Sequence, residues 1–137
     1  LEAIESAEAI LLAPSNPVTS IGPILAVPGI REALRTTSAP IGAISPIVGG
    51  AAVSGPAAAL MQAQGLPASI EGVARAYADF LDVLVVDTLD AAETGEIEAL
   101  GIRTLATNTI MTSQEVRAAL AAFALAGTRA AVREAVR

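Results

Sequence analysis

Small polar side chains cluster directly after the first apolar run of the chain. Ser15, Asn16 and Ser20 supply hydroxyl and amide groups, and Gly22 lets a ligand approach the backbone closely. The segment leads into a predicted helix, whose first backbone N–H groups are expected to be free to bind an anion. These residues therefore predict the binding of a phosphorylated ligand, while the same residue types also suit a capped strand-to-helix turn.

A second candidate segment, Ser45-Pro46-Ile47-Val48-Gly49-Gly50, follows another apolar run. Its paired glycines expose backbone N–H groups, as a phosphate-binding loop does. It is not a P-loop, because the Gly-Lys-Ser/Thr ending of that motif is absent. Ser45, Gly49 and Gly50 are thus candidates for ligand binding, with a plain flexible connection as the alternative.

The third segment carries acidic and aromatic residues. Tyr77 and Phe80 are three positions apart, so they share one face of a helix, which is typical of a core and less often of stacking against a ligand ring. Asp87 follows the run Val85-Val86. It is a candidate ligand for Mg²⁺ or a ribose hydroxyl, and a solvated aspartate in a turn is the alternative.

The composition excludes several kinds of chemistry. The 137 residues include no Cys, His or Lys, which excludes disulfides, thiolate nucleophiles and the commonest general base. Any metal is expected to be Mg²⁺ bound together with a phosphate. The net charge of −6 argues against nucleic acid, and the series Arg129, Arg133 and Arg137 is expected to be a solvated helix face.

The chain shows neither an apolar run long enough for a membrane span nor a signal peptide, so a cytoplasmic protein without a membrane partner is expected. The start Leu1-Glu2-Ala3-Ile4-Glu5 resembles the end of a helix, and the sequence is expected to be a piece of a longer protein. The 137 residues are accordingly one α/β domain or the C-terminal portion of one.

Short, continuously apolar runs alternate with helical patterns, which favours parallel strands covered on both faces. The predicted strands are Ala9–Ala13, Ile41–Ile44, Val83–Val86 and Thr104–Ala106. The predicted helices are Gly22–Arg35 with an interruption at Pro28-Gly29, Pro56–Gln64, Ser69–Phe80, Ala91–Leu100, and a last one from Ser113 onward with a break at Gly127. The order predicts an α/β fold with a Rossmann-like, mostly parallel sheet and flanking helices.

Ligands of such sheets bind beyond the carboxyl ends of the strands. In this chain those ends carry only small polar residues, namely Ser15, Asn16, Ser45, Asp87, Thr107 and Asn108. No nucleophile–base pair accompanies them. Any catalysis is therefore expected to rest on positioning and on neutralising charge.

The segment from Ala13 to Ile30 resembles the 2-phospho-L-lactate transferase family of deazaflavin-coenzyme biosynthesis. The segments Ser45–Gly50, Gly55-Pro56 and Tyr77–Asp82 resemble it as well, in the same order and spacing up to about Met111. The resemblance implies a Rossmann-type fold and a homodimer. It also implies transfer of a phospholactyl or phosphoenolpyruvyl group from a guanosine-diphospho donor to a deazaflavin (7,8-didemethyl-8-hydroxy-5-deazariboflavin), with Mg²⁺ and release of GMP, in coenzyme F-420 biosynthesis.

Carried over to this chain, the resemblance implies that Ser15, Asn16, Ser20 and Gly22 contact the donor nucleotide and that Ser45, Gly49 and Gly50 form a second wall. Two departures stand out. The glycine-rich nucleotide-binding segment with which family members start is absent, and Asn108 replaces an expected aspartate. The alternative function is that of a related family of regulators, a module that binds nucleotide sugars without turnover.

Overall fold

A four-stranded parallel sheet forms the centre of the computed structural model, which describes residues 1–53 and 55–131. Its strands are β1 (Ile10–Leu12), β2 (Ile41–Ile44), β5 (Val83–Asp87) and β6 (Arg103–Thr107), in the order β1-β2-β5-β6. Ile10 pairs with Ile41, Gly42 with Val83, and Val83 with Arg103. The predicted parallel α/β architecture is therefore confirmed, with strand limits within two residues of those expected.

A two-stranded antiparallel hairpin, formed by β3 (Ile47–Val48) and β4 (Ala51–Ala52), was not predicted. Gly49 and Gly50 form its turn, and both have positive φ angles of 58° and 74°. Two successive residues with positive φ are the requirement of the tight turn that matches strand twist. The paired glycines thus serve the hairpin geometry.

Helices and short helical turns connect the strands. They are α1 (Glu2–Glu5), the π-helix η1 (Pro17–Ile21), α2 (Gly22–Leu25), α3 (Ile30–Thr36), α4 (Ala57–Ala63), α5 (Ile70–Tyr77), the 3₁₀-helix η2 (Thr88–Asp90), α6 (Gly95–Ala99) and α7 (Gln114–Arg129). The expected interruption at Pro28-Gly29 separates α2 from α3. Ser69 and Ser113 cap α5 and α7 through their side chains, accepting from Gly72 N at 3.3 Å and Val116 N at 3.2 Å.

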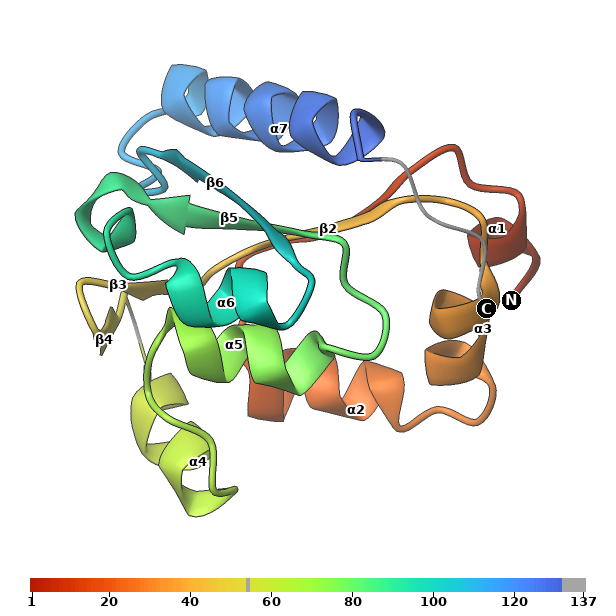
Figure 1. The fold of residues 1–137 in the computed structure, drawn as a ribbon, viewed down its shortest axis with the longest axis horizontal. Coiled ribbons are helices and arrows are strands. Elements are labelled where there is room, and N and C mark those ends of the chain that lie inside the picture. Colours follow the sequence, from red (N-terminus) through yellow and green to blue (C-terminus); the bar gives the residue numbers. More distant parts are fainter. Residues whose placement is uncertain (54, 132–137) are drawn as a thin grey trace.

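The sheet divides the molecule into two layers of different thickness (Figure 1). Helices α2, α5 and α6 lie on one face, and α7 lies on the other. Alternate residues of β5 serve the two sides, since Leu84 and Val86 belong to the larger core while Val85 packs with Leu120 and Ala124 of α7. All five residues of β5 are therefore buried, as expected of a strand covered on both faces.

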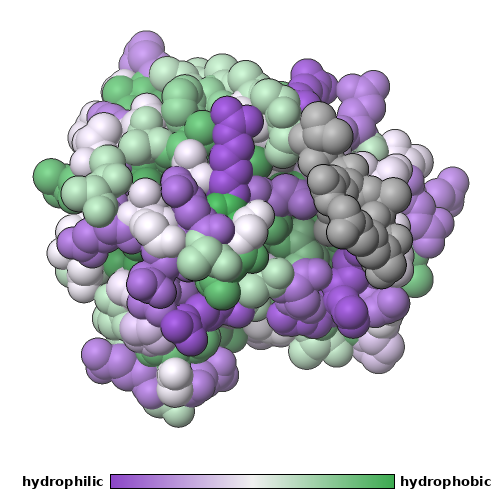
Figure 2. Space-filling model, in the orientation of Figure 1, coloured by the Kyte–Doolittle hydropathy of each residue, from purple (hydrophilic) through white to green (hydrophobic). Residues whose placement is uncertain are grey.

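Helix α7 rests on the sheet through a narrow stripe. Leu120, Ala124 and Thr128 are its buried residues, four positions apart, and five of its other thirteen residues are exposed alanines. In the space-filling view the top of the molecule, where α7 lies, is accordingly only weakly hydrophobic (Figure 2). Within the described residues, no helix combines the length and the apolar character that crossing a bilayer requires.

The predicted break of the last helix at Gly127 is wrong. Helix α7 continues through Gly127 to Arg129, and Arg133 and Arg137 of the expected cationic face lie outside the described residues. A Cβ atom at Gly127 would collide with the side chain of Leu105 in β6. This glycine is therefore compatible with a close approach of helix and sheet.

The predicted helix Ala91–Leu100 is wrong in its first half. The chain first forms η2, because Asp87 accepts a hydrogen bond from Leu89 N at 3.1 Å and turns the backbone directly after β5. Helix α6 then begins only at Gly95. The intervening residues 91–94 turn instead, with Glu93 N donating to the carbonyl of Asp90 at 2.9 Å.

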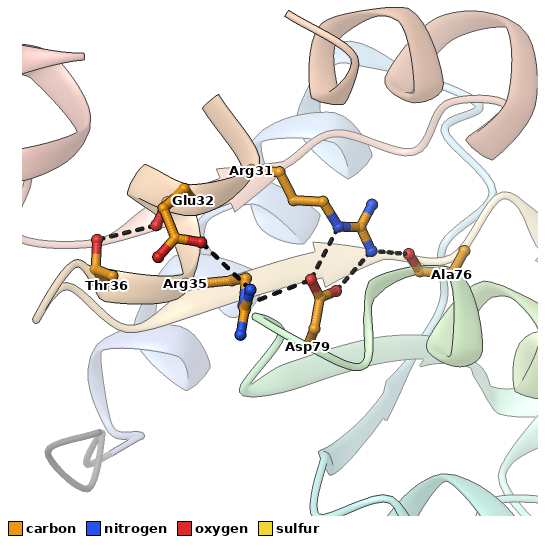
Figure 3. Close-up of polar contacts among 6 residues, drawn as sticks. All are labelled: Arg31, Glu32, Arg35, Thr36, Ala76 and Asp79. Atoms are coloured by element: carbon orange, nitrogen blue, oxygen red, sulfur yellow. Dashed lines mark hydrogen bonds and ion pairs between the residues drawn. The ribbon is translucent and has the colours of Figure 1, made fainter. Parts of the chain in front are cut away.

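An arginine clamp ties α3 to the end of α5 (Figure 3). Arg31 donates to both carboxylate oxygens of Asp79, at 2.8 and 2.6 Å, and to the carbonyl of Ala76 at 3.1 Å. Its guanidinium also lies 5.4 Å from the centre of the Phe80 ring. Fork-like pairing of this kind fixes both distance and orientation.

We predict that Gly42→Ala destabilises the protein by about 1–3 kcal/mol, the usual cost of overpacking. A Cβ atom at Gly42 would collide with the buried side chain of Thr128 in α7. Gly95→Ala is the matched control, because no atom lies within 4 Å of the added Cβ. Urea unfolding measures both, and equal stability of the two variants would contradict this packing.

Candidate functional site

A cleft of about 530 Å³ lies beyond the carboxyl ends of the strands. Its walls come from the loop after β1, the loop after β2, the start of α4 and the segment after β6. Four of the predicted ligand-binding residues line it together, namely Ser15, Asn16, Ser20 and Ser45. The volume lies within the usual range of small-molecule sites.

The side chain of Asn16 organises the first wall. Its Oδ1 accepts from Val18 N at 2.9 Å and from Thr19 N at 3.3 Å, and its backbone carbonyl accepts from Ser20 N and Ile21 N, each at 3.1 Å. The expectation of free backbone amides at this helix start is therefore wrong. Asn16 satisfies these donors from within the chain, as an N-cap residue does.

The hydroxyls of this wall differ from that of Ser45. Thr19 and Ser20 are exposed, Ser15 is half-buried, and none of the three hydroxyls bonds to another described residue. Ser45 is 2% exposed, donates to the carbonyl of Ile47 and accepts from Ile47 N, both at 3.1 Å. Ser45 thus shapes the turn into the hairpin, and the free hydroxyls belong to Ser15, Thr19 and Ser20.

Three predicted glycines lie apart from this cleft lining. Gly22 lines a separate hollow of about 310 Å³ together with Arg31 and Tyr77. Gly49 and Gly50 are exposed at the tip of the hairpin, and Gly49 N donates to Asp90 Oδ2 at 3.0 Å. Ligand binding by these glycines remains a prediction.

Asp87 holds the wall of the cleft that follows β6 in place. Its Oδ2 accepts from Thr109 N at 2.8 Å and from Thr109 Oγ1 at 3.0 Å, and its Oδ1 accepts from Leu89 N and Thr88 Oγ1. Burial raises the pKa of the Asp87 carboxyl, but these hydrogen bonds outweigh burial, and the pKa lies below its ordinary value of 3.8. The aspartate is therefore ionised and fully engaged by its own chain.

The segment held by Asp87 contributes Thr109, Ile110 and Met111 to the cleft. Sequence reasoning named Thr107 and Asn108 at this strand end and missed the three residues that follow. Val53 and Pro56 of the third wall were missed as well. The signal for Thr109–Met111 was present, because they come within five residues of the end of a predicted strand, whereas Val53 enters through the unpredicted hairpin.

A Mg²⁺ ion does not fit the described residues by themselves. Among residues 1–53 and 55–131, no group of three His, Cys, Asp or Glu side chains is arranged to hold a metal ion. Both oxygens of Asp87 accept hydrogen bonds from Leu89, Thr88 and Thr109. This geometry gives no support to Asp87 as a metal ligand, and Mg²⁺ itself stays a prediction.

The aromatic and acidic segment Tyr77–Asp82 is structural. Tyr77 and Phe80 are 3% and 2% exposed, and their ring centres lie 5.7 Å apart in the main core. Burial raises the pKa of the Tyr77 hydroxyl, and the charge of Arg31 lowers it to a smaller extent. Asp79 pairs with Arg31, and Asp82 accepts from Ile41 N at 2.7 Å.

Comparisons with known proteins show the family of the chain. A family model described as 2-phospho-L-lactate transferase CofD matches residues 1–121. The chain belongs to this family.

Two relatives show how much of the family's length is present. A 2-phospho-L-lactate transferase of Methanosarcina acetivorans is 50% identical over 123 residues, which are 90% of this chain and 39% of the relative. A phosphoenolpyruvate transferase of Streptomyces griseus is 49% identical over 126 residues, 91% of this chain and 40% of the relative. A crystal structure of a Bacillus halodurans protein, 22% identical, shares the fold with a TM-score of 0.52 over 83% of this chain and 40% of its own.

We predict that Asn16→Ala lowers the free energy of unfolding by about 1 kcal/mol, the usual value of an N-cap. The substitution leaves Val18 N and Thr19 N without their acceptor. Asn16→Asp keeps an acceptor at the same position and should retain most of the stability. Chemical denaturation distinguishes the two, and equal losses in both variants would argue against capping by Asn16.

We predict that Asp87→Asn destabilises the protein at neutral pH by about 1–3 kcal/mol, because an amide cannot accept all four hydrogen bonds. Since the folded-state pKa lies below 3.8, the carboxylate contributes its full stability above that value and loses it as the pH falls through the folded-state pKa. The stability gap between wild type and variant should therefore narrow below pH 3.8. Unfolding at several pH values measures this gap, with Glu96→Gln on the exposed surface of α6 as the control; a constant gap would contradict the assignment.

Proposed function

We propose that the protein acts as a transferase in coenzyme F-420 biosynthesis. It moves a phospholactyl or phosphoenolpyruvyl group from a guanosine-diphospho donor to a hydroxyl of a deazaflavin and releases GMP. Membership of the 2-phospho-L-lactate transferase family supports the proposal, as do relatives named for both three-carbon acids. The chain spans 39% and 40% of the relatives compared, so the proposal concerns the complete protein.

The observation that carries the proposal is the cleft at the carboxyl edge of the sheet. Its first wall is made by Ser15, Asn16 and Ser20, from the segment whose sequence resembles the family most closely. Its other walls come from loops that the chain holds in place with its own carboxylates and hydroxyls. A preorganised site of this kind positions a substrate without paying to order the loops on binding.

The residues around the cleft bind and orient substrate. Free hydroxyls at Ser15, Thr19 and Ser20 offer donors and acceptors, and Ile110 and Met111 add apolar surface to the lining. The chain contains no Cys, His or Lys, so the described residues include none of the usual nucleophile–base pairs. We propose that the reaction is assisted by Mg²⁺ and that the complete protein is a homodimer.

The test is turnover by the complete protein. With the deazaflavin acceptor and either guanosine-diphospho donor, we expect a new phosphorylated deazaflavin and an equal amount of GMP in chromatography. Thr19→Ala combined with Ser20→Ala should lower kcat/KM by about 10- to 100-fold, as the loss of one or two substrate hydrogen bonds does. Ser38→Ala, an exposed serine far from the cleft lining, is the control.

A complete protein that binds guanosine diphosphate and nucleotide sugars but forms no deazaflavin product would contradict the transferase proposal. That result would favour the regulatory alternative. Product formed from one donor only would identify the three-carbon acid, which differs between the two named groups of relatives.

A further inference from the structure

A second hollow lies behind the π-helix η1, apart from the cleft. Its volume of about 310 Å³ is at the lower end of the range of small-molecule sites. Pro17 and Val18 of η1 line it, whereas Thr19 and Ser20 of the same helix line the cleft. The remaining walls come from α2, α3, the end of α4 and α5, and no described residue lines both spaces. The hollow is therefore a separate candidate site.

The hydroxyl of Tyr77 is available to a ligand in this hollow. Tyr77 lines the hollow, is 3% exposed and packs its ring near that of Phe80 in the main core. Its hydroxyl bonds to no other described residue, and no fully buried side-chain oxygen among those residues lacks a partner. The hydroxyl therefore reaches the surface of the hollow. Because burial raises the pKa of this hydroxyl, it stays protonated and acts as a donor.

Arg31 and Gln64 add further donors to the same space. Arg31 uses Nε and Nη2 on the carboxylate of Asp79 and the carbonyl of Ala76. Its Nη1 bonds to no other described residue and points away from Asp79 (Figure 3). Gln64 is exposed, and its side-chain amide likewise bonds to no other described residue. Three side chains with unused donors thus line one hollow.

The charges beside the hollow favour a ligand with a single negative charge. Arg31 pairs with Asp79 at 2.6 Å, and Arg35 pairs with Glu32 at 3.3 Å and with Asp79 at 3.9 Å. Two cations and two anions therefore balance, which leaves no surplus positive charge for a dianion such as phosphate. A carboxylate adds one charge and still forms charge-assisted hydrogen bonds with the unused donors.

We propose that this hollow binds a small monocarboxylate with a short apolar chain. Its two oxygens accept hydrogen bonds from the Tyr77 hydroxyl, Arg31 Nη1 and the Gln64 amide. Its chain lies against Val18 and Leu25, which belong to the apolar part of the lining. The site is distinct from the cleft and does not rest on the proposed function.

The binding test uses the complete protein labelled with 3-fluorotyrosine. The ¹⁹F resonance of Tyr77 is identified as the one that disappears in Tyr77→Phe. Butyrate, its neutral analogue butyramide and inorganic phosphate are titrated at constant ionic strength. We expect butyrate to shift the Tyr77 resonance to saturation, at lower concentration than either of the other two probes.

Variants locate the contact, with affinity measured from the broadening of the butyrate proton signals. Tyr77→Phe is expected to weaken butyrate binding by about 3- to 10-fold, the range of one hydrogen bond. Gln64→Glu is expected to weaken it by about 3-fold through repulsion. Gln62→Glu is the matched control, because Gln62 is exposed on the same helix and does not line the hollow. Ser20→Ala, in the cleft, should leave butyrate binding unchanged.

A Tyr77 resonance that does not move with butyrate would overturn the proposal. So would equal or tighter binding of butyramide or phosphate, equal effects of Gln64→Glu and Gln62→Glu, or loss of butyrate affinity in Ser20→Ala. Chemical denaturation of Tyr77→Phe supplies a check on the unused hydroxyl. The variant should keep the stability of the wild type, and a clear loss would show that the hydroxyl serves the fold instead of a ligand.

Discussion

The loops at the carboxyl edge of the sheet must satisfy their own backbone N–H groups, and the candidate site depends on how they do so. Asn16, Ser45, Asp87 and Asp90 each accept hydrogen bonds from the loop they hold. A buried or half-buried amide left unpaired would cost about 1–3 kcal/mol. These four side chains therefore shape the walls of the cleft.

Satisfying the loops internally changes what the cleft can offer to a ligand. Asp87, whose position after a buried strand suggests a metal ligand, uses both carboxylate oxygens on Leu89, Thr88 and Thr109. Asn16 likewise uses its side-chain oxygen on the chain itself. The groups that remain include the hydroxyls of the loop after β1 and the apolar side chains of Val53, Ile110 and Met111. Asn16 and Asp87 thus shape the walls of the cleft, and other residues are left to bind the ligand.

Most of the fold could be predicted because its signals are local. Continuous apolar runs gave the four parallel strands, and the Pro28-Gly29 pair gave the break between α2 and α3. The errors have two sources: Gly127 stays helical in a close approach to Leu105 that the sequence does not show, and local turns after η2 delay α6 to Gly95. In the site, the strand-end rule found Ser15, Asn16 and Ser45, and the first polar segment added Ser20. Sequence cannot tell a side chain that bonds to its own backbone from one that is free.

The most direct test is a crystal structure of the complete protein with GDP and the deazaflavin bound. We expect a ligand in the cleft formed by the Ser15–Ser20 loop and Met111, with the bonds from Val18 N and Thr19 N to Asn16 intact. A phosphate group bound to those two amides, with the Asn16 side chain turned away, would contradict the account.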